Sequence, residues 1–229
     1  MTEWSRQEVV KKIPSHYKRP HNLRSFSYLL FDLGMIALLI FTYQRLSLPH
    51  LQWLVTLSFI YFMGVFFTAL WVLAHECGHG AFCRPFWLQS TVGYLIHCAL
   101  LTPYFAWRES HRLHHKYGNH RTLDTGYTGD SITPTGPNSS LAVCLEMLLT
   151  PLLFWLYLFS NNSMGSAYRQ HKTFRSQHLS THSFMMRHKA HLVRVDRVGL
   201  IAMLLLIGFC VYHFGLASVF CYYIGPLLV

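Results

Sequence analysis

Residues 51–74 read LQWLVTLSFIYFMGVFFTALWVLA, and residues 75–79, which follow directly, read HECGH. The first of these stretches carries no formal charge. About 20 apolar residues in a helix cross the roughly 30 Å hydrocarbon core of a bilayer. A second apolar run, 26–43, precedes it and contains one acid, Asp32. Because the connection 44–50 is short, the two runs predict an antiparallel hairpin of membrane-spanning helices.

The composition also indicates a membrane protein. Only 12% of the 229 residues are charged and 52% are hydrophobic, whereas soluble domains average about 25% charged residues. The net charge of +10 would suit nucleic-acid binding only on a soluble fold with a basic face. Here basic segments alternate with apolar runs, as in cytosolic loops of membrane proteins. We expect contact with the lipid bilayer, no nucleic-acid partner, a basic cytosolic segment at 1–25 and one domain over 26–229.

The histidine pattern indicates a metal site. Among sixteen histidines, His75 and His79 are spaced i, i+4, and a second group has i, i+3, i+4 spacing, so each set shares one helix face. Imidazole binds Fe, Zn, Cu and Ni well. The five candidate metal ligands are His75, His79, His111, His114 and His115.

The other histidines receive simpler interpretations. His97 lies within an apolar run and is expected to be a packed, hydrogen-bonded side chain. His120 is a candidate for a supporting role beside the ligands. Four histidines in the most basic stretch are expected to belong to a solvated cytosolic loop: His178, His182, His188 and His191.

A different metal chemistry also fits the first motif. His75-Glu76-Cys-Gly-His79 matches H-E-x-x-H, in which Glu76 would be the general base of an intramembrane zinc protease, with Asp124 as a remote ligand. A catalytic zinc needs only three protein ligands. The three histidines at 111–115 would then have no task, so a two-metal site accounts for more of the sequence.

A shared metal site restricts the topology. If the apolar run 86–105 crossed the bilayer, the two histidine groups would face opposite compartments. The run 141–159 precedes a strongly basic stretch that belongs in the cytosol. Both are expected to be interfacial or re-entrant segments covered by protein, with breaks at Pro103 and Pro151. The glycosylation sequences at Asn138 and Asn161 should then stay unmodified.

From Val198 the chain is apolar to its end. This run predicts a third spanning helix, a tight turn near Gly215 and the start of a fourth helix. The expected fold is therefore an all-α integral membrane protein. It would have two transmembrane helix hairpins, the second incomplete, interfacial or re-entrant helices, and a histidine-lined metal site facing the cytosol.

Two segments, Trp71-Val-Leu-Ala-His-Glu-Cys-Gly-His-Gly-Ala-Phe82 and Trp107-Arg-Glu-Ser-His-Arg-Leu-His-His115, resemble the histidine boxes of the membrane fatty acid desaturase family. The chain looks most like acyl-lipid omega-6 desaturases, which convert oleate to linoleate. The stretches 195–200 and 223–229 give weaker support. The likeness covers most of the chain from about residue 22.

The resemblance implies a non-haem site of two irons, with the five histidines named above as ligands. Glu76 and Glu109 would at most orient ligands, and Glu109 departs from the residue type the family leads us to expect there. The family's third HxxHH box is not found, so we expect the chain to be truncated before it. No His-Pro-Gly-Gly motif of a fused cytochrome b5 domain occurs.

The family resemblance further implies a fatty acyl lipid substrate, a location in the endoplasmic reticulum membrane, and separate cytochrome b5 with its reductase as electron donor. Hydroxylases and acetylenases share the motifs, and a truncated or degenerate non-catalytic relative would also look like this. Aromatic residues near the boxes would either line an acyl tunnel or anchor the protein at the membrane interface. These are Trp71, Phe82, Tyr104 and Trp107.

Overall fold

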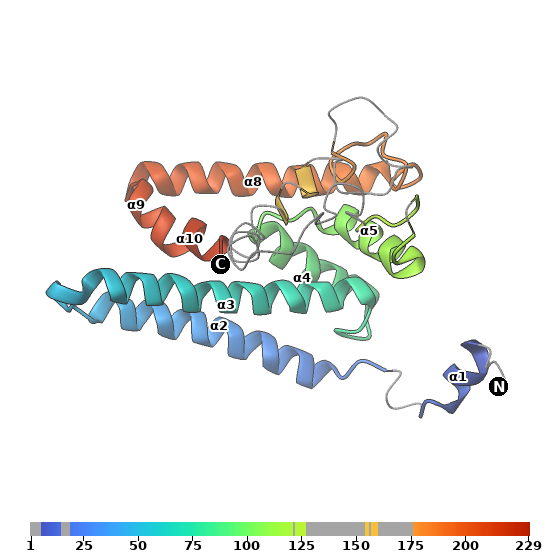
Figure 1. The fold of residues 1–229 in the computed structure, drawn as a ribbon, viewed down its shortest axis with the longest axis horizontal. Coiled ribbons are helices and arrows are strands. Elements are labelled where there is room, and N and C mark those ends of the chain that lie inside the picture. The colour runs from blue at the N-terminus through green and yellow to red at the C-terminus, as the bar shows by residue number, and fades with distance from the viewer. Residues whose placement is uncertain (1–5, 15–18, 121, 127–153, 156, 160–175) are drawn as a thin grey trace, which may run out of the picture.

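The computed structural model describes residues 6–14, 19–120, 122–126, 154–155, 157–159 and 176–229. Within these ranges every regular element is a helix (Figure 1). The first five are α1 (Arg6–Lys12), α2 (Asn22–Arg45), η2 (Pro49–Leu51), α3 (Gln52–His79) and α4 (Phe86–Ala99). The others are α5 (Tyr104–Tyr117), α8 (Ala190–Phe214), α9 (Leu216–Val219), the π-helical turn η3 (Phe220–Ile224) and α10 (Gly225–Leu227). The predicted all-α class is confirmed.

Three helical stretches of the described chain are long and apolar enough to cross a membrane. They are α2 with 24 residues, η2 and α3 together with 31, and α8 with 25. Many of their large apolar side chains face outward, such as Leu205, which is 70% exposed. Such surfaces are stable when lipid covers them, and the chain is therefore a membrane protein.

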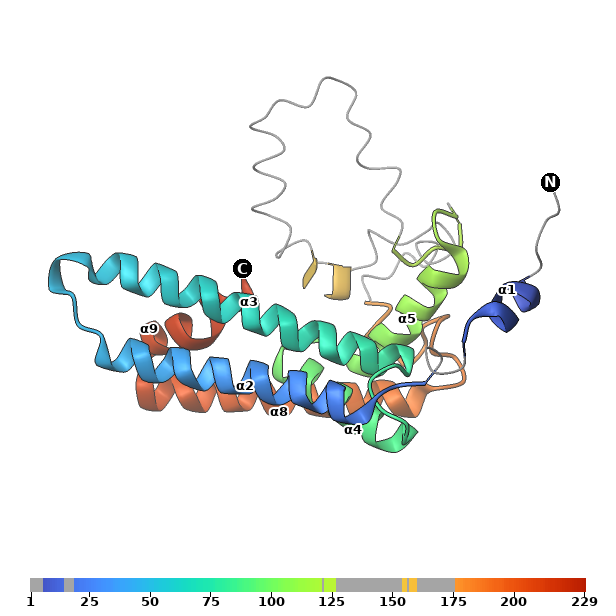
Figure 2. The ribbon, with the colours of Figure 1, turned by 90° about the horizontal axis from the view of Figure 1, so that it is seen from below.

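The helices α2 and α3 pack antiparallel along most of their length (Figure 2). Near their connection, the ring of Tyr43 stacks on Phe59 with centroids 4.2 Å apart. The Tyr43 hydroxyl lies 3.0 Å from Thr56 Oγ1, which satisfies two polar groups inside apolar helices. These contacts fix the pair at the end that lies away from the histidines.

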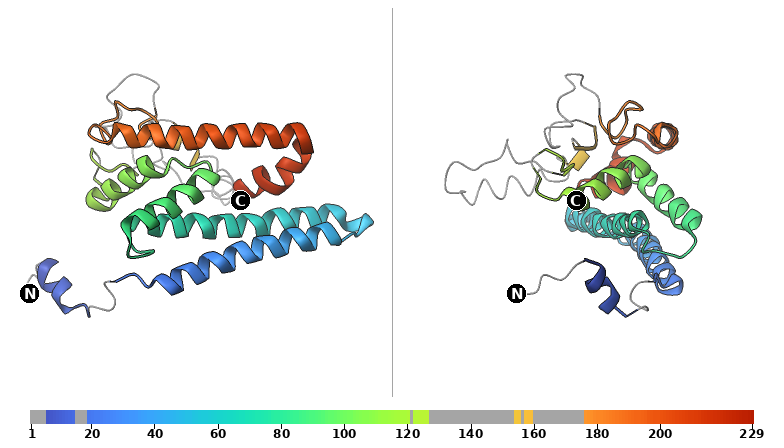
Figure 3. Two further views of the ribbon diagram at one scale, coloured as in Figure 1. Left: turned by 180° about the vertical axis from the view of Figure 1, so that it is seen from behind. Right: turned by 90° about the vertical axis from the view of Figure 1, so that its right-hand side faces the viewer.

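The end of α8 turns back as the sequence predicts. Gly215 has φ of 80° and ψ of 155°, a conformation that favours glycine. The chain then returns through α9, η3 and α10 toward α3 (Figure 3). An added Cβ on Gly64 of α3 would lie 2.4 Å from Val229 Cβ, so glycine lets the returning segment approach α3 closely.

Between the long helices lie α4 and α5, each with 14 residues. Each spans about 21 Å, too short to cross the hydrocarbon core as a helix. This agrees with the prediction that 86–105 does not cross. Most of 141–159, including Pro151, lies outside the described residues, and so do both glycosylation sequences. The end of α3, the helix α5 and residues 176–189 gather at one end of the molecule (Figure 1).

Candidate metal centre

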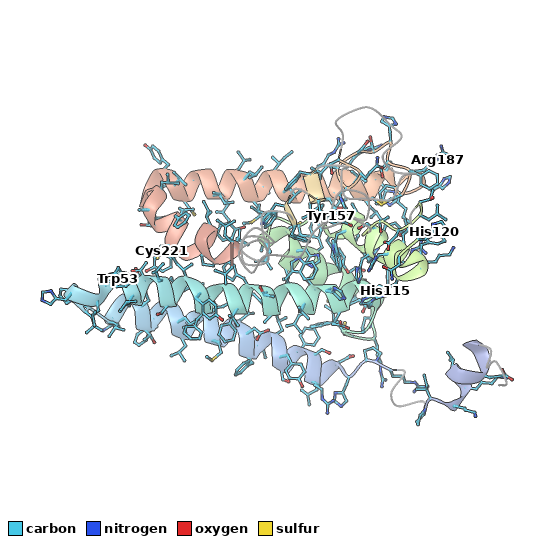
Figure 4. All side chains as sticks on the ribbon, in the orientation of Figure 1. Trp53, His115, His120, Tyr157, Arg187 and Cys221 are labelled. Atoms are coloured by element: carbon cyan, nitrogen blue, oxygen red, sulfur yellow. The ribbon has the colours of Figure 1, made fainter. Side chains whose placement is uncertain are left out.

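Four of the five predicted ligands meet where α5 crosses the end of α3. His75 and His79 occupy the last turns of α3, which ends at Gly80 with φ of 77°. The Nε2 atoms of His75 and His79 are 2.9 Å apart, and His79 Nε2 lies 3.1 Å from His111 Nε2. His115 Nε2 continues the row, 2.9 Å from His111 Nε2, at the end of the molecule where Figure 4 labels His115.

Hydrogen bonds between neutral imidazoles cannot account for all of these short nitrogen–nitrogen distances. A neutral ring nitrogen has either one hydrogen or one lone pair, yet His79 Nε2 and His111 Nε2 each have two close nitrogen neighbours. Imidazole nitrogens bind a metal such as zinc at about 2.0–2.1 Å, so two at right angles stand about 2.9 Å apart and two at the tetrahedral angle about 3.4 Å. The observed spacings are closer to the right-angle value, and the donor set fits a metal ion held by several imidazoles.

The ligand nitrogens of His75, His79 and His111 all lie within 4.8 Å of one another. Partial burial and the neighbouring imidazoles lower the pKa of His111 to about 3. His111 is therefore neutral at physiological pH, and neutral imidazole is the form that binds metal.

His114 is oriented by a carboxylate. Its Nδ1 lies 2.7 Å from Asp124 Oδ1, which also accepts the Gly126 N–H at 2.8 Å. Asp124 Oδ2 accepts the Asn119 N–H at 2.7 Å. Burial raises the pKa of Asp124, but these hydrogen bonds outweigh it and hold the pKa below its ordinary value. A carboxylate on one imidazole nitrogen fixes the ring so that the other nitrogen can bind metal.

The position of Asp124 bears on the protease hypothesis. That hypothesis needs Asp124 beside His75 and His79, whereas the structure places it on His114. Asp124 is also absent from the group of close ligand atoms that the described residues form. The geometry therefore favours a histidine-rich centre over an HExxH protease site.

An aromatic layer supports the imidazoles. The ring of Trp107 stacks on His111 with centroids 4.8 Å apart and planes 13° apart. His97 is fully buried, and its Nε2 lies 3.3 Å from the Trp71 carbonyl oxygen, in agreement with the predicted packed histidine. Burial lowers the pKa of His97 to about 3, so this ring stays neutral. Trp71 also borders an apolar cavity of about 330 Å³ together with Leu100 and Phe154.

The other proposed aromatic positions are packed inside the protein. Phe82, Tyr104 and Trp107 are 1%, 0% and 3% exposed, which excludes them as anchors at the membrane interface. Phe82 and Tyr104 belong to one buried cluster with Cys77 and Cys83. Of the four aromatics, only Trp71 borders the cavity of about 330 Å³.

The acidic candidates take different positions. Glu109 accepts hydrogen bonds from Arg112 Nε at 3.0 Å and from Lys189 Nζ at 2.7 Å. Burial raises its pKa, but these two cations outweigh burial and lower it. The unexpected Glu109 thus joins α5 to residue 189. Glu76 is partly exposed on α3, and its carbonyl accepts the Ala81 N–H at 2.9 Å.

His120 makes local contacts. Its Nδ1 accepts the backbone N–H groups of Thr122 at 3.2 Å and Leu123 at 3.3 Å. These bonds shape the turn that leads to Asp124, so the described contacts of His120 support the loop that orients His114. Figure 4 labels it at the histidine-bearing end of the molecule.

Sequence reasoning missed His178. The predicted solvated loop is correct for His182 and His188, which are exposed. His191 is also exposed but lies in the first turn of α8, and the prediction is wrong for His178, which is fully buried. Its Nε2 lies 2.9 Å from Ser110 Oγ, next to His111. The partners are 68 residues apart in sequence, so no pattern within a short stretch of sequence predicts this contact.

Long apolar helices and a cluster of imidazoles that could hold a metal ion are the two main features of the described structure. The chain belongs to the fatty acid desaturase family, whose sequence model matches residues 51–229. No solved structure matches it.

Several named relatives are similar to this chain. The Delta(12) fatty acid desaturase FAD2 of Calendula officinalis is 31% identical over 97% of this chain and 59% of its own length. The Delta(12) fatty acid desaturase of Mortierella alpina is 29% identical over the whole chain and 62% of its own length. An endoplasmic reticulum omega-6 fatty acid desaturase of Brassica juncea is 44% identical over 47% of the chain and 29% of its own length. The chain thus spans about three fifths of the first two relatives.

Proposed function

We propose that this chain forms the core of a di-iron acyl-lipid desaturase that introduces a double bond into a fatty acyl chain. The observation that carries the proposal is the convergence of imidazoles from α3 and α5 at separations of 2.9–3.1 Å. The Delta(12) names of the similar proteins support an acyl-lipid substrate desaturated at that position.

In this proposal His75, His79, His111, His114 and His115 hold two non-haem irons. Bound iron supplies the oxidising chemistry needed to remove hydrogen from an unactivated methylene pair, with dioxygen as the oxidant. Acidic or nucleophilic side chains cannot do this, because such a C–H bond has neither an acidic proton nor a leaving group.

The chain's own residues have three tasks. Burial and mutual proximity keep His111 neutral and able to donate its lone pair. Asp124 holds the ring of His114 by its Nδ1 atom. The apolar cavity beside Trp71 offers room for part of an alkyl chain within reach of the His75 ring, whose centroid lies 5.7 Å from that of Trp71.

The electron balance requires a partner. Reducing dioxygen to two waters takes four electrons, of which desaturation of one methylene pair supplies two. The other two must come from a donor, and we propose cytochrome b5 with its reductase. The exposed basic residues around the histidine-bearing end, such as Arg187 and Lys116, suit an acidic partner. We further propose that this end faces the cytosol from the endoplasmic reticulum membrane.

Iron analysis tests the proposal directly. The complete reading frame is expressed in a yeast that lacks polyunsaturated lipids, and the protein is purified in detergent. Elemental analysis should find bound iron in the wild type and a large loss of iron in His111→Ala. The matched control is His213→Ala, because His213 is exposed near the opposite end of α8 and should leave iron content unchanged.

Lipid analysis of the same cells tests the reaction. New dienoic acyl chains that disappear in His111→Ala would support desaturation, whereas a hydroxy product would reassign the reaction. A wild-type protein that binds no iron, or a His111→Ala variant with full iron content, would contradict the proposed function.

A further inference from the structure

A carboxylate from a membrane helix binds the first turn of the histidine helix α5. Asp196, the seventh residue of α8, is fully buried. Its Oδ1 accepts the Phe105 N–H at 3.1 Å and its Oδ2 accepts the Ala106 N–H at 2.9 Å. The first N–H groups of a helix have no partner inside that helix. Pro103, which precedes α5, provides no side-chain cap, so the capping carboxylate comes from 90 residues later in the sequence.

The energetics of this arrangement make Asp196 hard to replace. Burying a carboxylate is costly unless hydrogen bonds compensate, and a partly positive helix N-terminus is a favourable partner. Loss of the carboxylate would leave two buried amide donors without their acceptor, which costs more than the hydrogen bonds themselves contribute.

Neighbouring contacts make the junction between α8 and α5 rigid. Val193 of α8 packs with Ala106 of α5 and with Met186 in one buried cluster. Tyr94 of α4 donates its hydroxyl to the Val195 carbonyl at 2.9 Å. Because α4 packs against both α8 and α3, a carboxylate on α8 can hold the first turn of α5 in place relative to α3.

The position of α5 sets the geometry of the histidine cluster. His111 lies about one and two-thirds turns beyond Phe105 on the same helix, and its Nε2 lies 3.1 Å from His79 Nε2 on α3. A small rotation or slide of α5 would separate the imidazoles of the two helices. We propose that Asp196 is a positioning residue for the metal centre, which it serves by fixing the first turn of α5 relative to α3. The inference rests on the proposed metal site and assigns a supporting residue to it.

Cobalt binding provides the first test. Full-length wild-type protein, Asp196→Asn and Asp32→Asn are purified in detergent, stripped of metal and titrated with Co²⁺ while visible absorption is recorded. Asp32→Asn is the matched control, because Asp32 is also a buried acid in a long apolar helix, α2. We expect Asp196→Asn to remain folded by circular dichroism but to bind Co²⁺ roughly ten-fold or more weakly, as when ligand-orienting groups are lost. Asp32→Asn should bind with wild-type affinity.

Hydrogen exchange of the metal-free proteins provides a second test that does not depend on metal binding. Exchange in a peptide that covers Tyr104–Trp107 should be roughly ten-fold or more faster in Asp196→Asn, because asparagine has no charge and replaces one of the two acceptor oxygens with an NH2 donor that cannot accept a backbone N–H. Exchange around residues 60–70 of α3 should not change. Unchanged exchange in α5, or wild-type cobalt affinity in Asp196→Asn, would overturn the positioning role. Wild-type protein that binds no Co²⁺ while α5 still responds would instead contradict the proposed metal site.

Discussion

At the scale of single residues, burial and hydrogen bonding distinguish several groups among the histidines that the structure describes. Four imidazoles meet through their Nε2 atoms. His97 and His178 are fully buried and bonded to the Trp71 carbonyl and the Ser110 hydroxyl. Histidines such as His182 are exposed. Each group should therefore respond differently to substitution.

Asp124 should control metal affinity through His114. Replacing Asp124 with Ala removes the acceptor at 2.7 Å from His114 Nδ1, so the ring loses its fixed orientation. We expect iron or cobalt affinity to fall about 10–100-fold, measured by metal titration of purified protein. His182→Ala serves as a surface control and should change nothing. An Asp124→Ala variant with unaltered affinity would show that His114 does not need this partner.

His178 should make stability depend on pH. Burial lowers its pKa to about 4, whereas an unfolded histidine titrates near pH 6.5. Between these values the unfolded chain binds the proton and the folded chain does not, so stability is lost as pH falls from about 7. This residue alone should account for about 2 kcal/mol between pH 7 and pH 5.

The measurement compares thermal unfolding of the wild type and His178→Gln at pH 7 and pH 5. The variant should be less stable at pH 7 because it loses the Ser110 contact, yet it should lose less stability on acidification. Equal losses in both proteins would show that His178 is not the neutral buried group described above.

At the scale of elements, α4 packs against both histidine helices through small residues. An added Cβ on Gly93 would lie 2.5 Å from Tyr104 Cε2 and 2.8 Å from Cys77 Cβ. Tyr104 is fully buried and Cys77 Cβ belongs to the body of α3, so neither can move aside. The close approach brings α4 and α5 against the end of α3.

Gly93→Ala should therefore destabilise the protein by about 1–3 kcal/mol, as overpacked cores do, and lower the thermal midpoint by several degrees. Gly208→Ala is the matched control: it lies in the helix α8, and nothing lies within 4 Å of its added Cβ. Its helix propensity should raise stability by up to about 1 kcal/mol. A shift of the same sign in both variants would contradict this packing.

Sequence patterns predicted some elements well and others not at all. The uncharged run 51–74 predicted the spanning helix, and the histidine spacing predicted the cluster, because each pattern lies within a short stretch of sequence. The bonds from Asp196 to α5, from Lys189 to Glu109 and from His178 to Ser110 each link positions far apart in sequence. The periodicity of a sequence does not predict contacts between distant positions, and for this reason the burial of His178 was not predicted.

At the scale of the whole molecule, the two ends differ in the residues that they carry. The four clustered histidines, α5 and residues 176–189 lie at one end, whereas the connector between α2 and η2 and the turn between α8 and α9 lie at the other (Figures 1 and 3). The predicted cytosolic placement of the basic residues puts the connector on the opposite side of the membrane.

Glycosylation mapping should verify this orientation. The sequences at Asn138 and Asn161 should stay unmodified in eukaryotic membranes, so glycosidase treatment should leave the electrophoretic mobility of the wild type unchanged. A lengthened connector that carries an engineered acceptor asparagine between residues 46 and 48 should gain a glycan. A glycan on Asn138 or Asn161 would place these segments in the lumen and separate them from a cytosolic centre.

The length of α3 bears on how deep in the membrane the histidine cluster lies. Its 28 residues extend about 42 Å, about 12 Å more than the hydrocarbon core. With the connector at the far surface, this excess lifts His75 and His79 into the headgroup layer. Under the proposed function, the tail of a lipid substrate would have to bend out of the hydrocarbon core toward the headgroups before its middle carbons reached these histidines. The distance from the hydrocarbon core to the histidines would then depend on membrane thickness and would be shorter in a thicker bilayer.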